Sequence, residues 1–375
     1  MIKGITLTLM IGPAVPVPVG HDVLDALQSV TVTDGSGDTQ SGFELTFAVD
    51  KRSPLTTVFL ISGGASIPLM RVLLIVTISG QASALIDGVM THHQFSPGSG
   101  GKPSTLTIQG KDLSAAMDLL EFNGLWYPAM PPFARVNLVL AKYAWLGIIP
   151  KVIPSLDTPP LPIERVPRHQ GTDLCYIRQL AAQAGYTFYF EPGTTPGTSI
   201  AYWGPEVRVG TPQPALSTDM DTHTNVESLS FQFDKEGTEI PVVFIQNRLT
   251  KAPIPIPIPS QIPFYPPLGA LPPIPPKVTM LDDTAQLSAV GALVRGFAYA
   301  ATHSNAVAGS GTLDVLRYGR VLKSRRLVGV RGAGLAFDGV HYVDSVTHEL
   351  TRGSYKQNFT LKRSGLLPTQ PTVPV

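Results

Sequence analysis

Strict alternation of apolar and polar positions marks much of this chain, and the clearest example lies near its C-terminus. Residues 341–349 and 355–363 alternate on either side of the polar cluster 351–354, whose composition is typical of a turn. This pattern predicts a β-hairpin. Residues 85–89 and 105–109 alternate in the same way around a loop rich in glycine and serine, so we expect the hairpin to occur twice.

A second pair of segments indicates an internal duplication. Residues 45–51 (LTFAVDK) match residues 229–235 (LSFQFDK) in their apolar triplet and their Asp-Lys end. These strands are offset by 184 residues, from 45 to 229, whereas the hairpins are offset by 257, from 86 to 343. The second copy is therefore predicted to hold 73 additional residues as an insertion, although chance alternation in a β-rich chain is an alternative.

The duplication predicts a specific superposition. Residues 27–110 should superpose on residues 225–246 together with 311–363, with residues 250–310 left out. Because residues 1–110 show strand and turn patterns throughout, a closed or nearly closed antiparallel barrel is the expected structure for each copy.

Helical periodicity begins after residue 110, and it predicts a separate α/β domain over residues 111–214. Asp112 is positioned to cap a helix whose buried face would hold Leu113, Ala116, Met117 and Leu120, and residues 133–145 offer a second helix. Thr172 or Asp173 is expected to cap a third helix that ends at Gly185, followed by a strand over residues 186–190.

The remaining residues predict a second barrel interrupted by an insertion. The barrel is expected to comprise residues 215–250 and 311–365, and the insertion residues 251–310. Eleven of the 25 residues from 252 to 276 are proline, so this segment should be extended and unable to form a central strand. A helix is expected over residues 284–302, and residues 366–375 form a short proline-rich tail.

Composition suggests a surface covered by partner proteins. Charged residues make up only 15% of the 375 residues, and the net charge of +1 argues against a large basic face for nucleic acid. Cys175 is the single cysteine, which excludes an intrachain disulfide and favours a reducing cytoplasm. The N-terminus has no secretory-signal pattern, and the most apolar window, residues 58–78, is too interrupted for a membrane span.

Candidate chemical motifs fail on inspection. The loop over residues 96–104 differs from a phosphate-binding loop because Ser96 stands at the first glycine, Pro103 replaces the serine or threonine that would ligate magnesium, and the loop joins two strands instead of opening a helix. Gly329, Gly332 and Gly334 lack dinucleotide-binding spacing and are expected to form a turn or bulge. Other candidates favour structural roles: His92 and His93 face opposite sides of a strand, Asp219, Asp221 and His223 lie in a turn-rich linker, and Cys175 is expected to be packed. We expect no catalytic, metal-binding or cofactor-binding residue, no cofactor and no enzymatic activity.

The densest charge in the chain is a basic run. A solvated strand rim is the favoured interpretation, and a site for acidic neighbours or a polyanion is the alternative. Its members are Arg317, Arg320, Lys323, Arg325, Arg326 and Arg331.

Several of these segments resemble the central hub of contractile tail baseplates. Residues 339–348 and 353–363 are similar to the closing signature of that family, and residues 170–180 with 185–189 are similar to its middle domain. The family includes the late control D proteins of contractile phages, the hub half of the type VI valine-glycine repeat proteins, and the hubs of extracellular injection particles. The resemblance implies a mainly β fold with α+β insertions: two tail-tube-like antiparallel β-barrels in one chain plus a middle α/β domain.

The resemblance also implies partners. Three chains would form a homotrimer with a pseudo-sixfold ring that joins the sixfold tail tube, or tube-initiator proteins, to a threefold spike. We expect the spike to be a separate protein, because the chain stops at Val375. Baseplate wedge or sheath-side proteins and transient contact with cargo or DNA in the lumen are further implied, without stable membrane insertion.

The expected location is the bacterial cytoplasm during assembly, and then a phage virion or an injection particle. These two settings stay open, as does whether the basic run faces the lumen or a partner. A tail-associated cell-wall hydrolase, or a host-binding adhesin that uses residues 252–276, is the alternative function.

Overall fold

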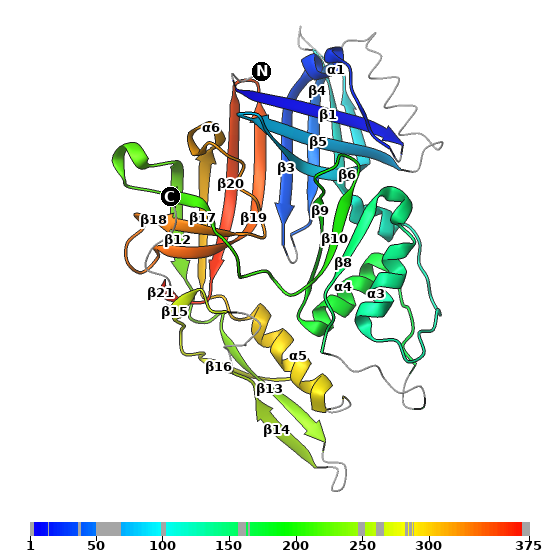
Figure 1. Ribbon diagram of the computed structural model, residues 1–375, viewed down its shortest axis with the longest axis vertical. Helices are drawn as coiled ribbons and strands as arrows, with labels where there is room; N and C mark the ends of the chain where they lie inside the picture. The colour runs from blue at the N-terminus through cyan, green and yellow to red at the C-terminus, as the bar shows by residue number, and fades with distance from the viewer. Residues whose placement is uncertain are drawn as a thin grey trace.

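The computed structural model describes residues 4–13, 15–36, 39–49, 69–98, 103–156, 163, 166–246, 252–259, 266–281, 284, 287 and 289–369. In this part of the chain, one thirteen-stranded sheet dominates, with two three-stranded sheets and one two-stranded sheet beside it. Figure 1 shows the large sheet in the upper part of the molecule, with helices α3 and α4 grouped on one side and α5 below. The predicted mainly β fold with added helices is confirmed.

The first half of the large sheet follows the predicted strand patterns. Its strands pair antiparallel in the order β3-β4-β7-β6-β5-β1-β2, and helix α1 (His21–Ala26) precedes β3. On β4, apolar side chains at every second position point into the core, which is the period expected of a half-buried strand. The strands are β1 (Ile5–Pro13), β2 (Val17–Pro18), β3 (Leu27–Gly35), β4 (Gly42–Val49), β5 (Met70–Ile78), β6 (Gln81–Ser96) and β7 (Ser104–Asp112).

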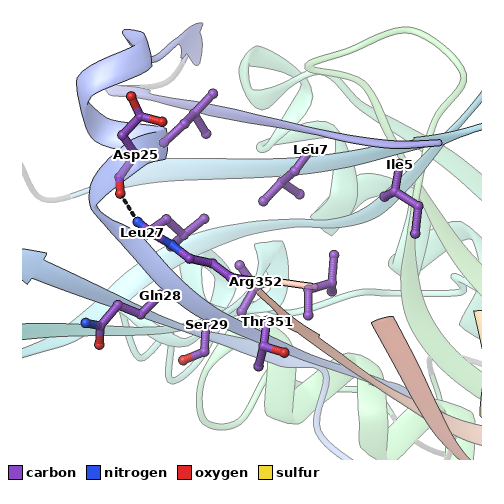
Figure 2. Close-up of a pocket in the computed structure, with 11 residues that line it drawn as sticks. Ile5, Leu7, Asp25, Leu27, Gln28, Ser29, Thr351 and Arg352 are labelled. Atoms are coloured by element: carbon purple, nitrogen blue, oxygen red, sulfur yellow. Dashed lines mark hydrogen bonds between the residues drawn. The ribbon is translucent and has the colours of Figure 1, made fainter. Parts of the chain in front are cut away.

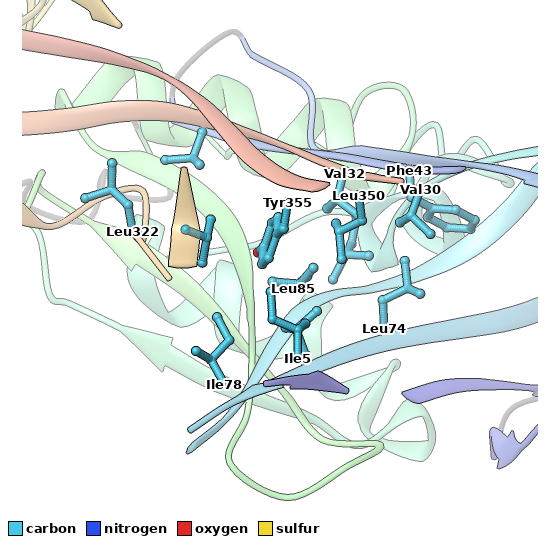
Figure 3. Close-up of a cluster of buried hydrophobic side chains, with 14 of the residues drawn as sticks. Ile5, Val30, Val32, Phe43, Leu74, Ile78, Leu85, Leu322, Leu350 and Tyr355 are labelled. Atoms are coloured by element: carbon cyan, nitrogen blue, oxygen red, sulfur yellow. The ribbon is translucent and has the colours of Figure 1, made fainter. Parts of the chain in front are cut away.

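The second half of the sheet contains β12, β17, β20 and β19 in that order, and β18 pairs with both β19 and β11. Strand β19 then pairs antiparallel with β3, so the two halves form one continuous sheet over one hydrophobic core (Figure 3). The elements are β11 (Gln213–Ser217), β12 (Val226–Phe233), β17 (Val307–Asp314), α6 (Val315–Tyr318), β18 (Leu327–Arg331), β19 (Gly339–Thr351) and β20 (Ser354–Arg363).

The two halves are internal repeats. Strands β3, β4, β5, β6 and β7 correspond to β12, β17, β18, β19 and β20, because both sets have the same chain order and pair in the same order. Their irregularities also coincide. The register shift between Leu27 and Ser29 recurs between Val226 and Ser228, and the hairpin shift between Met90 and His92 recurs between Val343 and Ser345. The predicted duplicated hairpin is confirmed.

The predicted match of Leu45 with Leu229 is wrong. Leu45 lies on β4, whereas Leu229 lies on β12, the counterpart of β3, and the shared register shift aligns Leu229 with Val30. The strand that corresponds to β4 is β17, which carries glycine at the inward positions of Phe43 and Leu45. Aromatic rings of Phe231 and Phe359 fill this space, since a Cβ added at Gly309 or Gly311 would lie 2.7 Å from one of these rings.

The insertion lies between β12 and β17. Strands β13 (Glu239–Gln246), β14 (Pro253–Pro257) and β16 (Lys277–Leu281) form a sheet in the order β14-β13-β16, and helix α5 (Ala289–Thr302) packs against it. Residues 239–246, predicted in the second barrel, therefore belong to the insertion, whereas residues 307–310, predicted in the insertion, belong to β17. The alternating prolines confine β14 to a sheet edge, as expected.

A two-stranded sheet joins β15 (Gly269–Leu271) to β21 (Leu366–Pro368). The start of the predicted tail is thus paired with the insertion, and residues 370–375 lie outside the described residues.

The middle domain forms around its own core. Thr172 caps α4 by accepting from the Cys175 amide at 3.2 Å, and Gly185 ends the helix with a φ of 69°, both as predicted. Asp112 also caps as predicted, but its helix is a short 3-10 turn and Leu120 is exposed. The elements are η1 (Leu113–Asp118), α3 (Pro132–Ala141), η2 (Ala144–Leu146), β8 (Ile148–Val152), α4 (Asp173–Ala184), β9 (Thr187–Pro192) and β10 (Ser199–Gly204), with η3 (Asp221–His223) following β11.

Candidate assembly surface

The face of the large sheet opposite the core is lined mainly by polar and charged side chains. Alternate residues on each strand point to this face, and the strand registers align them in rows that cross from the second half into the first. One row crosses β12, β17, β20, β19, β3, β4 and β7 in turn, and we call this face the polar face. The row contains Ser228, Thr312, Asn358, Thr347, Thr33, Gly42 and Lys111.

Hydrogen bonds between neighbouring strands stabilise the polar face. At the junction of the halves, the Thr33 and Thr347 hydroxyls lie 3.3 Å apart, and within the second half Thr312 donates to Asn358 at 2.8 Å. Three of its carboxylates also have partners: Glu349 accepts from Asn358, Glu44 from Gln109 and Glu227 from Lys356, each at 2.8 Å. The face is consequently polar, and hydrogen bonds hold these three carboxylates in place.

A buried arginine reinforces the junction between the halves. The Arg325 side chain is 4% exposed and pairs with the Asp34 carboxylate of β3, while its Nε donates to the Gly35 carbonyl at 3.1 Å. Ser324 donates to Asp34 at 2.6 Å. Because a buried charge requires a partner, this network stabilises the alignment of the halves.

The predicted basic run is divided among different environments. Arg325 is buried at the junction, and Arg326 forms an ion pair of 2.8 Å with Glu191 of the middle domain. Arg317, Arg320 and Lys323 are exposed, as the solvated-rim interpretation predicts. The run is therefore not one continuous patch.

A buried ion pair attaches the middle domain to the first half. The Arg71 guanidinium of β5 binds the Asp87 carboxylate of β6 through bonds of 2.7 and 2.6 Å. Arg71 also donates to the Leu146 carbonyl at 2.8 Å, and Ser199 donates to Asp87 at 2.7 Å. This network was not predicted from the sequence, where its signal is an arginine, Arg71, inside an apolar window.

Two histidines of the repeated hairpin are buried and neutral. His348 lies with its Nδ1 2.8 Å from the Tyr355 hydroxyl, and burial lowers the pKa of His348 from 6.5 to about 4. Burial, together with the positive charge of Arg363, lowers the pKa of His341 to about 3. Both side chains therefore act as polar core residues at neutral pH.

The candidate chemical residues lie on β6 and in the segment around η3. His92 and His93 are consecutive on β6, and Asp219, Asp221 and His223 are exposed. Among the described residues, no group of three or more His, Cys, Asp or Glu side chains is placed to hold a metal ion. The Ser96 to Ser104 loop connects β6 to β7, and residues 99–102 of it lie outside the described residues.

Two further predictions can be compared with the structure. Gly332 and Gly334 have φ values of 82° and 90° after β18, which confirms a turn. The expectation that Cys175 is packed is wrong, because Cys175 is exposed. The buried face of α4 uses Leu174, Ile177 and Leu180, and Cys175 falls outside this stripe.

A pocket of about 340 Å³ lies between β1 and the junction strands β3 and β19. Figure 2 shows Ile5 and Leu7 on one side and Arg352 on the other, where Arg352 donates to the Asp25 carbonyl. No pairing joins β1 to β3 within the described strands, so the pocket is the open seam of the first half. The charged side chains that line the pocket are Asp25 and Arg352.

No family model and no curated relative matches the sequence. Solved structures do match its fold. A tail protein from Neisseria meningitidis MC58 superposes with a TM-score of 0.64 and 14% identity, covering 97% of this chain and 98% of that chain. The 43 kDa tail protein of prophage MuSo2 from Shewanella oneidensis gives 0.57 and 14%, covering 97% and 99%.

The chain has a tail-protein fold. A chain of the Francisella PdpA–VgrG complex shares this fold at a TM-score of 0.62 and 9% identity, with 100% of this chain and 55% of that chain covered. The tail-protein fold thus extends over nearly the whole chain, including the insertion. Among the described residues, no helix is long and apolar enough to cross a membrane.

Proposed function

We propose that this chain is the structural central hub of a contractile tail or injection-system baseplate. The observation that carries the proposal is the pair of repeated halves joined edge to edge, with the polar face running across the junction. A hub of this kind adapts the sixfold tail tube to the threefold spike. Likeness to tail proteins supports the proposal at the level of the fold.

Three copies of the chain suit this role. A sixfold tube consists of single repeats, so a chain with two repeats covers the same ring with three copies. Head-to-tail contacts of this kind usually close with cyclic symmetry. The expected homotrimer has three times the chain mass of 40.1 kDa, or about 120 kDa.

The polar face suits the lumen of such a ring. Its hydroxyl and amide groups are hydrated, so passing cargo or DNA finds little apolar surface to adhere to. Lys356 is paired with Glu227, so this positive charge of the face already has an acidic partner. We propose that the polar face lines the channel and contacts cargo transiently.

The insertion is proposed to mark the change from sixfold to threefold symmetry, since it occurs in one half only. Pro253, Pro255 and Pro257 lack amide hydrogens, so the outer edge of β14 is a poor template for a further strand. We propose that this element lies against a neighbouring protein.

The proposed partners are tube or tube-initiator proteins, a separate spike protein and wedge or sheath-side proteins, in an assembly built in the bacterial cytoplasm.

A structural hub needs no catalytic site, and we propose that the chain is not an enzyme. Hydrolysis of peptidoglycan, peptides or nucleotides by the purified chain would contradict this proposal. If Asp219→Ala or Asp221→Ala abolished such activity, the active site would lie in the segment that contains these two residues.

The copy number tests the proposed hub. The purified chain is combined with the tube and spike proteins encoded beside its gene, and native mass spectrometry counts the subunits. We expect three copies per particle. Six copies, or a monomer that binds neither protein, would contradict the proposal.

A further inference from the structure

Among the described residues, one stretch of β6 and one edge of β12 in the large sheet have no strand paired with them. Strand β6 is 16 residues long, and its pairing with β5 reaches only to Val89, so beyond His92 the described strands cover it on the β7 side alone. Strand β12 is paired with β17 on one side, and no described strand pairs with the other. Exposed strand edges with free amide and carbonyl groups are templates for pairing with another chain.

The internal repeat shows what covers such an edge. Strand β19 is the counterpart of β6, and its equivalent edge is covered by β3, the counterpart of β12. The junction inside the chain is therefore a β19–β3 pair. If the repeat continues from one copy to the next, the matching pair is β6 of one copy with β12 of the next.

We infer that His92 to Ser96 of one copy pair antiparallel with Ser230 to Asp234 of a second copy of this chain. This inference rests on the proposed ring and identifies the contact that closes it.

The register follows from the shared irregularities. His92 on β6 is equivalent to Ser345 on β19, because each directly follows the register shift of its hairpin. Ser228 on β12 is equivalent to Ser29 on β3, because each directly follows the register shift of its strand. The internal pair Thr347–Thr33 thus corresponds to Gln94 with Gln232 between copies. The neighbouring internal pair His348–Val32 corresponds to Phe95 with Phe231.

Side-chain chemistry fits this register. Phe95 is 42% exposed in the single chain, whereas its counterpart His348, on the strand paired with β3, is 4% exposed. Pairing would place Phe95 beside the half-buried Phe231 on the core side, and aromatic cross-strand pairs stabilise sheets. Gln94 and Gln232 would extend the polar face, and His92 would lie opposite Asp234.

The contact is expected to be short. Pro97 follows Ser96 and has no amide hydrogen, so pairing should stop there. The internal junction spans seven residue pairs, and the contact between copies spans five, from His92 to Ser96.

Cysteine cross-linking tests this register in the full-length chain. The background is Cys175→Ser, because Cys175 is exposed. The test variant carries Gln94→Cys with Gln232→Cys. The mismatched variant carries Gln94→Cys with Ser228→Cys, and the internal control carries Thr33→Cys with Thr347→Cys, whose native hydroxyls lie 3.3 Å apart.

Mild oxidation should produce covalent dimers and trimers from the test variant alone, and an intrachain bond in the internal control. If native mass spectrometry shows a trimer but the test variant does not cross-link, the strand contact is wrong and the proposed trimer stands. If the chain is monomeric at every concentration, the trimer and the contact both fail.

A second variant separates assembly from folding. Phe95→Asp should raise the chain concentration at which half of the protein is assembled roughly tenfold or more, because the contact between copies would bury a carboxylate. The single chain should stay folded, since Phe95 is already exposed. Leu120→Asp changes a 66% exposed leucine of the middle domain and should leave assembly unchanged. Equal assembly of both variants would overturn the inference.

Discussion

Replacing Arg71 with methionine is expected to lower the free energy of unfolding by about 3–5 kcal/mol, the usual cost of leaving one partner of a buried ion pair alone. The Arg71 and Asp87 side chains are 3% and 1% exposed, so water cannot replace the lost partner. Because Arg71 also donates to the Leu146 carbonyl, the variant should loosen the middle domain from the first half. Chemical denaturation and limited proteolysis measure the two effects.

Lys277→Met is the matched control for this variant. Lys277 forms an ion pair of 2.8 Å with Glu239, but its side chain is 63% exposed. Solvent screens such a pair, so we expect little change in stability. A similar loss of unfolding free energy in both variants would mean that burial does not determine how much the Arg71–Asp87 pair stabilises the chain.

Stability is expected to fall as the pH drops from about 6.5 to about 4, because His348 must stay neutral in the folded chain. Its folded pKa is lowered relative to the unfolded chain, so in this window the unfolded state binds the additional proton. From His348 alone, the free energy of unfolding should decrease by about 1.4 kcal/mol per pH unit, or about 3 kcal/mol over this window. His341 acts in the same direction.

His348→Gln should remove the His348 contribution to this pH dependence and leave that of His341, since glutamine keeps an acceptor for the Tyr355 hydroxyl but does not titrate. Urea denaturation at pH 7, 5.5 and 4 compares the variant with the parent chain. His223→Gln changes an exposed histidine and should retain the parent slope. An unchanged slope in His348→Gln would show that other groups cause the acid sensitivity.

Local patterns predicted the local structure well. The hairpin β19–β20 and the capped helix α4 lie where alternation, Thr172 and Gly185 place them. These features depend on neighbouring residues, so a single sequence contains the information. The proline-rich segment likewise forms an edge strand, because its prolines lack the amide hydrogens needed to pair with a second neighbouring strand.

The correspondence between strands was not predictable in the same way. In the first half, bulky side chains on β4 fill the core, whereas in the second half Gly309 and Gly311 of β17 leave that space to Phe231 of β12 and Phe359 of β20. In the second half, the apolar residues that match those of β4 therefore lie on β12 and not on β17. Matching the two sequences by their apolar positions consequently aligns Leu45 with Leu229, although their strands do not correspond. Only the pairing registers show which strands correspond.

The assembly surface depends on contacts distant in sequence. Thr33 and Thr347 are 314 residues apart, and Arg71 and Ser199 reach Asp87 from separate elements. Each of these residues is ordinary in its local pattern. Their roles follow from the order in which the strands pair, which single-sequence periodicity does not contain.

Electron cryo-microscopy of the assembled chain, viewed along the ring axis, distinguishes the proposed hub from other assemblies. We expect a closed ring of three chains with six repeating sheet segments around the channel. We also expect three outer protrusions formed by β13, β14, β16 and α5, because the insertion occurs once per chain. A ring with six such protrusions, or an open filament of chains, would contradict the proposed trimeric hub.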